Sequence, residues 1–266
     1  MIFHGRCTLG KEREMEIVWH GTASVELRTK EGKILFDPFV PLKGSPVDIG
    51  VEEFDGFDEI FITHGHLDHI ASLPSVYKRN PNIRIRCTKT PYRTLRRKGI
   101  PKENLVLINF GDEISVFDFK IRILHGKHAR LPRLTAKLLA ELLSTPSKEN
   151  LPYLLHEHTL CKERGETVFY DIEAEGKRIS LIGSLNLRND TEYPTESDLL
   201  VLPYNGWTDN FPPASSVIER LRPKRVLLDH YDVTFPPATR EINLAPILEK
   251  YGDRVQPLVH RKVEIL

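Results

Sequence analysis

The stretch from Ile62 to His69, with the sequence ITHGHLDH, constrains the fold of this chain more than any other. It holds three imidazoles and one carboxylate within six residues. A helix or a strand, with periods of about 3.6 and 2 residues, would point these side chains in different directions. They converge only in a loop, and we expect that loop to follow a buried strand over the apolar run Glu59–Ile62.

Converging neutral imidazoles and a carboxylate suit a borderline-soft dication such as Zn²⁺. The alternative is a polar loop with surface histidines. We disfavour it because histidines rarely crowd in this way without a metal to hold them. The stretch therefore predicts a metal site.

Short runs in which apolar and polar residues alternate predict strands along most of the chain. The runs 106–108 and 114–117 flank Gly111 and Asp112, so we expect them to pair as a hairpin. The strongly apolar run Asp198–Pro203 suits a strand in a sheet that is covered on both faces. Strands followed by helices recur in two similar halves, which is consistent with packed layers of sheets and helices.

The order His-x-His-x-Asp-His after a buried strand resembles the signature of the metallo-β-lactamase-fold hydrolases. Two other regions are similar to that family. One is a hairpin opening that ends at Asp37-Pro38. The other is a helix-Pro-strand unit that ends at His230-Tyr231 and is followed by Phe235-Pro236.

The resemblance extends from about Glu16 to Pro237, apart from an insertion. It implies an α+β fold of four layers (αββα), in which two mixed sheets pack face to face with helices outside them. The metal site would lie at one edge of the sheets. We expect residues 1–266 to form one such domain, with a helical insertion at about 129–165.

The resemblance also implies two groups of metal ligands. The first consists of His64, His66 and His128, and the second of Asp68, His69 and His230. In related enzymes the third histidine of the first group follows a strand. Here the strand 119–124 runs into the sequence HGKH, where the spacing favours His128 over His125. The expected cofactor is Zn²⁺, one or two ions per chain, with Mn²⁺ or Fe²⁺ as alternatives.

Two residues near the start bear on this site. Asp37 could accept a hydrogen bond from a ligating imidazole and thereby fix the tautomer of that ring. Capping the turn before Pro38 is the alternative role for its carboxylate. Many relatives carry a histidine where this chain has Thr22. His20 is displaced from that position, so we do not expect it to be a ligand.

The pair Gly183-Ser184 departs from the family pattern. Most binuclear members carry an aspartate after that glycine, and its carboxylate bridges both metals. The hydroxyl of Ser184 supplies neither the charge nor two ligating oxygens, so the second metal is in question. Asp190 is the nearby carboxylate that could reach the site instead. After the apolar strand, Tyr204 and Asn205 lie in a loop that we expect to form a wall for the substrate.

The insertion at about 129–165 contains two expected helices. One carries leucines at 134, 138 and 142, and the other spans 151–160. The insertion could roof the pocket, form the contact of a homo-oligomer, or cover a sheet edge.

His156, His158 and Cys161 lie close together within this insertion. Their spacing lacks a complete four-ligand pattern for a metal. We therefore expect them to have surface or packing roles.

Composition and charge disfavour several partners and compartments. The formal net charge is +1, so no global field attracts nucleic acid or an anionic membrane. Basic residues cluster from Arg84 to Lys98, but a solvated helix face explains them better than a nucleic-acid track. No run approaches the roughly 20 apolar residues of a membrane span. The first residues lack the apolar region of a secretion signal, and the three cysteines form no Cys-x-x-Cys pair, so we expect a cytoplasmic protein.

By its size, its hairpin opening and its His-Tyr ending, the chain most resembles the branch with sugar-phosphate lactonases and phospholipase-D-like enzymes. This implies a hydrolase that uses a metal-bound hydroxide to cleave a small ester, lactone or phosphodiester, with a small-molecule substrate as its partner. Asp68 is the expected catalytic residue. It could ligate the metal, orient the hydroxide, or carry its proton to a leaving group.

Two alternatives to this function stay open. A nuclease acting on RNA or DNA is one, because the arginine cluster permits it. A non-catalytic metal- or ligand-binding module is the other, because Ser184 replaces the usual bridging aspartate. The sequence has no Gly-x-Ser-x-Gly elbow and no phosphate-binding glycine loop, so serine chemistry and NTP hydrolysis have no support.

Overall fold

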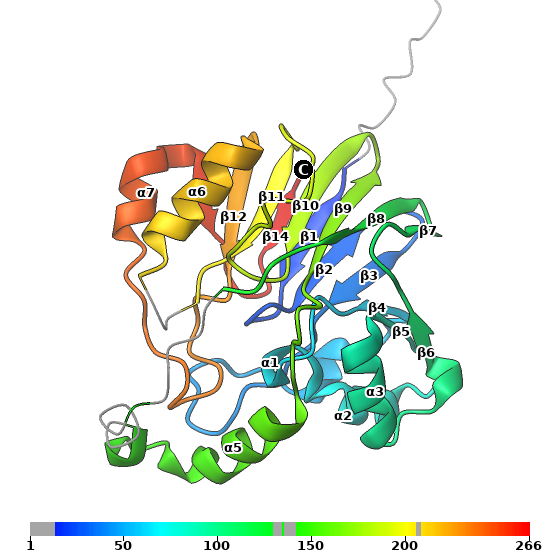
Figure 1. Cartoon of the computed structure of the whole chain (residues 1–266), viewed down its shortest axis with the longest axis vertical. Helices are drawn as coiled ribbons and strands as arrows, with labels where there is room; N and C mark the ends of the chain where they lie inside the picture. The colour runs from blue at the N-terminus through cyan, green and yellow to red at the C-terminus, as the bar shows by residue number, and fades with distance from the viewer. Residues whose placement is uncertain (1–13, 130–134, 136–141, 206–208) are drawn as a thin grey trace, which may run out of the picture.

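The computed structural model describes residues 14–129, 135, 142–205 and 209–266. In this part of the chain, two seven-stranded sheets pack face to face, and helices cover the outer face of each sheet (Figure 1). Both sheets mix parallel and antiparallel pairs. The predicted α+β arrangement of four layers is confirmed.

The first sheet comes mostly from the first half of the chain. Its order is β14-β1-β2-β3-β4-β5-β6, antiparallel from β14 to β3 and parallel from β3 to β6. Its strands are β1 (Glu16–Trp19), β2 (Val25–Arg28), β3 (Lys33–Phe36), β4 (Glu59–Phe61), β5 (Arg84–Cys87), β6 (Leu105–Leu107) and β14 (Val263–Ile265).

The second sheet repeats this plan. Its order is β13-β12-β11-β10-β9-β8-β7, antiparallel from β7 to β10 and parallel from β10 to β13. Its strands are β7 (Glu113–Val116), β8 (Phe119–His125), β9 (Val168–Ala174), β10 (Lys177–Ile182), β11 (Leu199–Pro203), β12 (Arg225–Asp229) and β13 (Val255–Pro257).

The predicted hairpin between 106–108 and 114–117 is wrong. β6 pairs in parallel with β5 in the first sheet, whereas β7 pairs with β8 in the second. Gly111 and Asp112 lie where the chain crosses between the sheets, and both form backbone hydrogen bonds to Ile123 of β8. Alternation of apolar residues identifies a strand but not its partner, because the same pattern suits either sheet.

Helices cover the sheets on both outer faces. α1 (Leu67–Ile70), α2 (Leu73–Arg79) and α3 (Lys89–Arg97) pack on the first sheet, and α6 (Phe211–Leu221) and α7 (Ala245–Tyr251) pack on the second. Short 3-10 helices are η1 (Val51–Phe54), η2 (Lys102–Asn104), η3 (Lys148–Asn150) and η4 (Gly252–Arg254). None of the described helices is long and apolar enough to cross a membrane.

The predicted insertion contains α5 (Leu151–Leu160), as expected from the sequence. Leu154 of this helix packs in the same cluster as the helices of the first sheet. Leu134 and Leu138, on the other expected helix, lie outside the described residues.

Alternate residues of one strand serve different cores. In β4, Phe61 packs between the sheets, whereas Ile60 packs against the helices of the first sheet. In β11, Val201 faces the other sheet, whereas Leu200 packs against α6 and α7. All four side chains are buried, as expected for strands that are covered on both faces.

Tyr170 of β9 joins the two sheets, because its buried hydroxyl donates a hydrogen bond to the Ile62 carbonyl at 2.7 Å. The Tyr170→Phe variant should lower the free energy of unfolding by about 1–3 kcal/mol, since the carbonyl loses its donor inside the core. Chemical denaturation measures this change. Tyr153→Phe is the control, because Tyr153 is 41% exposed on α5. Equal stabilities of the two variants would contradict the prediction.

The thiols of Cys87 and Cys161 are free and buried. Burial raises the pKa of Cys161 to about 12 and raises that of Cys87 as well. Because alkylation needs the thiolate, both should resist iodoacetamide at pH 8 until the protein is unfolded. Peptide mapping by mass spectrometry reports each site separately. Rapid labelling of either thiol in the folded protein would refute the prediction.

Candidate metal centre

Three histidines meet at the end of the first sheet. His64 and His66 lie in the loop between β4 and α1, and His128 lies in the loop after β8. Nε2 of His64 lies 3.2 Å from Nδ1 of His66, and the His128 ring is 4.8 and 4.5 Å from those two rings between centroids. One ring nitrogen from each histidine lies within 4.8 Å of the others.

A second group lies beside the first. Asp68 and His69 are in the first turn of α1, and His230 directly follows β12. Oδ2 of Asp68 lies 3.0 Å from Nε2 of His230 and 3.6 Å from Nε2 of His69. Each of the three residues offers one ligand atom within 4.8 Å of the other two. The structure thus brings together all six side chains that the sequence singled out as ligands.

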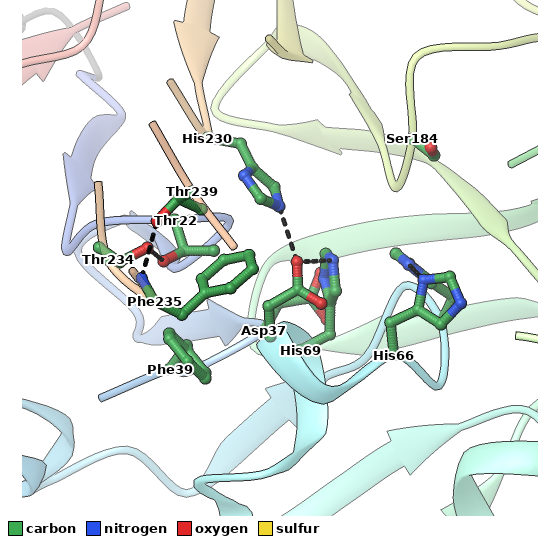
Figure 2. Close-up of polar contacts among 12 residues, drawn as sticks. Thr22, Asp37, Phe39, His66, His69, Ser184, His230, Thr234, Phe235 and Thr239 are labelled. Atoms are coloured by element: carbon green, nitrogen blue, oxygen red, sulfur yellow. Dashed lines mark hydrogen bonds and ion pairs between the residues drawn. The ribbon is translucent and has the colours of Figure 1, made fainter. Parts of the chain in front are cut away.

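The buried carboxylate of Asp37 shapes the loop that carries these ligands. Its Oδ1 accepts the backbone N–H of Thr63 at 2.8 Å, and its Oδ2 accepts the Thr63 hydroxyl at 2.5 Å. The same Oδ2 lies 2.7 Å from Nδ1 of His69, which leaves Nε2 of that ring facing the site. Figure 2 shows Asp37 and His69 side by side beneath His230. Asp37 thereby sets both the path of the loop and the orientation of one imidazole.

Two glycines allow the chain to pass close to this loop. A Cβ on Gly65 would lie 2.3 Å from the carbonyl oxygen of Lys162, just after α5. A Cβ on Gly183 would lie 2.5 Å from Cβ of Thr63. Real side chains do not tolerate such contacts, so both positions need glycine. The loop is therefore enclosed by the insertion on one side and by the end of β10 on the other.

His128, and not His125, reaches the metal site. Nδ1 of His128 donates to the carbonyl of Ala129 at 2.5 Å, which leaves Nε2 of that ring available. His125 instead donates from Nε2 to the carbonyl of Gly165 at 2.8 Å and stacks on Phe110. The structure thus places His128, which the spacing favours, beside His64 and His66.

His230 is held by the turn that contains Thr22. The backbone N–H of His230 donates to the Thr22 carbonyl at 2.8 Å. The N–H of Thr22 in turn donates to the Asp232 carboxylate, and its hydroxyl lies 2.6 Å from that of Thr234. Thr22 and His230 both have left-handed backbones, with φ of 49° and 59°. The surrounding hydrogen bonds stabilise this strained backbone, which sets the direction of the His230 side chain.

The sequence alone does not predict this role of Thr22. Only the Gly21-Thr22 turn signal hinted at an unusual backbone there. His20 lies apart from the two ligand groups, and its buried ring bonds to Glu26 and Glu53.

The histidines of the first group are neutral. Burial lowers the pKa of His64 well below its ordinary value, and the neighbouring imidazoles lower it further. Burial also lowers the pKa of His66 to about 4 and that of His128 below its usual range. Each ring therefore keeps a lone pair that can bind a cation.

The second group carries charge. Burial would raise the pKa of Asp68, but His69 and His230 outweigh this and lower it, so the carboxylate is ionised. Burial opposes protonation of His230, yet its hydrogen bond to Asp68 raises its pKa to about 9. The pKa of His69 is raised in the same way, chiefly by Asp37 against the effect of burial. A metal ion bound here would replace the proton of His230 as the partner of the Asp68 carboxylate.

Both groups fit a divalent metal by their donors and spacing. Zinc–nitrogen bonds of about 2.0–2.1 Å place tetrahedral ligands about 3.3 Å apart. The two nitrogens of His64 and His66 lie 3.2 Å apart. Each group supplies three ligands, which leaves a coordination position for water or substrate.

Of the other residues that the sequence places near the site, some line the cavity and others lie away from it. Ser184 and Asn205 line the cavity over the ligands, and Ser184 accepts the N–H of Ala129 at 3.0 Å. In Figure 2, Ser184 stands apart from His69 and His230. Asp190 does not reach the site, because it pairs with Arg188 on the surface.

Tyr204 does not form the expected wall for a substrate. It is 2% exposed and packs in the cluster between the second sheet and its helices. Pro203 and Asn205 face the cavity instead. The period of 2 at the end of a strand explains this, since neighbouring residues point to opposite faces.

The cavity over the ligands measures about 210 Å³. Its walls are largely apolar, with Phe235 held edge-on by Phe39 and its N–H bonded to Thr239 (Figure 2). The lining residues besides the six ligands are Leu67, Leu142, His158, Gly183, Ser184, Pro203, Asn205, Phe235, Ala238 and Thr239. The sequence predicts a surface or packing role for His158, yet this residue lines the cavity.

Asp37→Asn should weaken metal affinity about 10- to 100-fold, because an amide cannot accept all three of the hydrogen bonds that orient Thr63 and His69. Competition with a chromophoric chelator measures the affinity. Asp190→Asn is the matched control and should bind metal like the parent protein. Unchanged affinity in Asp37→Asn would mean that the carboxylate serves only the turn.

Comparisons with known proteins bear on this site. A family model described as the beta-lactamase superfamily domain matches residues 33–231. A protein of Methanobrevibacter smithii named UPF0173 metal-dependent hydrolase is 25% identical over 228 residues, which cover 85% of each chain. A UPF0173 metal-dependent hydrolase of Desulfitobacterium hafniense is 48% identical, but over only 58 residues, or 24% of its length.

The fold is also found among solved structures. Igni18, described as a novel metallo hydrolase from the hyperthermophilic archaeon Ignicoccus hospitalis, is similar with a TM-score of 0.61. The match is 18% identical and covers 95% of this chain and 98% of that one. This similarity supports the layered fold.

Proposed function

The chain belongs to the beta-lactamase superfamily, and on this premise we propose that it is a metal-dependent hydrolase of a small ester, lactone or phosphodiester. One observation carries the proposal: six ligand-type side chains in two groups form the floor of a small, largely apolar cavity. Zn²⁺ is the proposed ion, one or two per chain, with Mn²⁺ or Fe²⁺ as alternatives.

The proposed chemistry divides between the ion and the chain. When bound by His64, His66 and His128, or by Asp68, His69 and His230, a dication would lower the pKa of a water from 15.7 to about 7 and polarise a substrate oxygen. The ionised carboxylate of Asp68 would accept the proton that such a water releases. The apolar walls would exclude further water from the reacting groups.

The basic cluster gives little support to the nuclease alternative. Arg84 and Arg86 both pair with the buried carboxylate of Glu59, and Lys98 pairs with Glu157. These pairs neutralise part of the charge that a phosphate backbone would need. The opening to the ligands is a small cavity rather than a long groove.

The test begins with metal content per chain after purification without chelators. One or two equivalents are expected, followed by turnover of p-nitrophenyl acetate, γ-butyrolactone or bis(p-nitrophenyl) phosphate. Asp68→Ala should reduce turnover at least 100-fold while the fold survives, because the site loses a ligand and its proton acceptor. Asp190→Ala is the control.

Two outcomes would refute this function. Failure to bind Zn²⁺, Mn²⁺ or Fe²⁺ would exclude a metal-dependent activity. Metal binding without turnover of any of the three compounds would favour the non-catalytic binding module.

A further inference from the structure

Helix α5 is fixed against the rest of the molecule by contacts on one face. Leu154 is buried among the helices of the first sheet, and Glu157 is 6% exposed. Nζ of Lys98, at the end of α3, donates to both carboxylate oxygens of Glu157 at 2.8 and 2.6 Å. The thiol of Cys161 bonds to the same carboxylate at 3.2 Å. The position of this helix therefore does not depend on a ligand.

His158 lies on this helix one turn after Leu154, next to the buried face, and it stays exposed. It lines the cavity together with the six ligand-type residues, and its ring interacts electrostatically with Asp68. No hydrogen bond joins the ring to another residue of the described chain. His156 lies two residues earlier on the same helix, so it points in another direction and does not line the cavity.

The ring is neutral near pH 7. Partial burial lowers its pKa, and the ammonium of Lys162 lowers it further, against a smaller opposing effect of Asp68. A neutral imidazole offers one N–H donor and one acceptor. Among the described lining residues outside the two ligand groups, it is the only titratable side chain.

We propose that His158 is a substrate-contacting residue whose imidazole N–H donates a hydrogen bond to an oxygen of the substrate. This inference rests on the proposed hydrolase function and deepens it. The substrate is then a small compound with an oxygen that faces α5. Its carbon atoms pack on the apolar walls formed by Leu67, Leu142 and Phe235.

The test uses two hydroxamic acids of equal length, because hydroxamates bind zinc without needing turnover. 3-Methoxypropanohydroxamic acid carries an ether oxygen where pentanohydroxamic acid carries a methylene group. The protein is loaded with Zn²⁺, and calorimetry gives the Kd of each compound. The parent protein should prefer the methoxy compound by about 2- to 10-fold, the range for one hydrogen bond.

The variants separate this contact from a structural role. His158→Ala should abolish the preference, and His158→Gln should restore part of it through its amide N–H. His156→Ala is the control on the same helix and should keep the preference. Metal content and thermal unfolding should be unchanged in all three variants.

Three results would overturn the inference. If the parent binds both compounds with equal Kd, or if His158→Ala keeps the preference, His158 makes no such contact. If His158→Ala and His158→Gln both lose metal or stability, the residue has a structural role. If the parent binds neither compound and hydrolyses no ester, the proposed function fails, and the inference fails with it.

Discussion

The buried carboxylate of Asp37 is the interaction on which the site depends. It follows β3, yet it holds the loop after β4 through Thr63 and orients His69 in α1. A loop rich in histidines has no regular hydrogen-bond ladder of its own, so its backbone donors need such a partner. Because one carboxylate satisfies both the backbone and an imidazole, the path of the loop and the aim of the ligands are set together.

The two sheets meet at this loop. The N–H of Val168 in β9 donates to the Thr63 carbonyl at 2.8 Å, and Tyr170 in the same strand donates to Ile62. The first sheet in turn positions a ligand-type residue that follows the second sheet. The carbonyl of Thr22, in the turn between β1 and β2, accepts a hydrogen bond from the backbone N–H of His230. Neither sheet supplies a complete ligand group by itself. His128 and His230 follow strands of the second sheet, whereas the other four ligand-type residues follow β4 of the first sheet.

The cavity has a polar floor and apolar walls, which is an arrangement suited to small organic substrates. The walls come from segments far apart in the chain, including the loop after β11, the region around Phe235, and α5 of the insertion. Leu142 and His158 thus line the pocket, which agrees with one of the three roles open to this segment from the sequence. The bonds from Lys98 to Glu157 hold α5, and with it the backbone of His158, independently of any ligand.

The sequence by itself determined the layered fold, and it predicted the six ligand-type residues that the structure brings together. The spacing in ITHGHLDH predicts a loop, which the structure shows for His64 and His66, whereas Asp68 and His69 lie in α1. The recurring strands and helices predict covered sheets, and both signals are local patterns. Only the tertiary structure decided that β6 and β7 belong to different sheets, that Asn205 rather than Tyr204 faces the cavity, and that His158 lines it. These features depend on contacts between distant residues, such as the bond between Lys98 and Glu157 across 59 positions, which holds the helix of His158. Local periodicity does not identify such partners, because residues far apart in the chain come into contact only when the sheets and helices pack together.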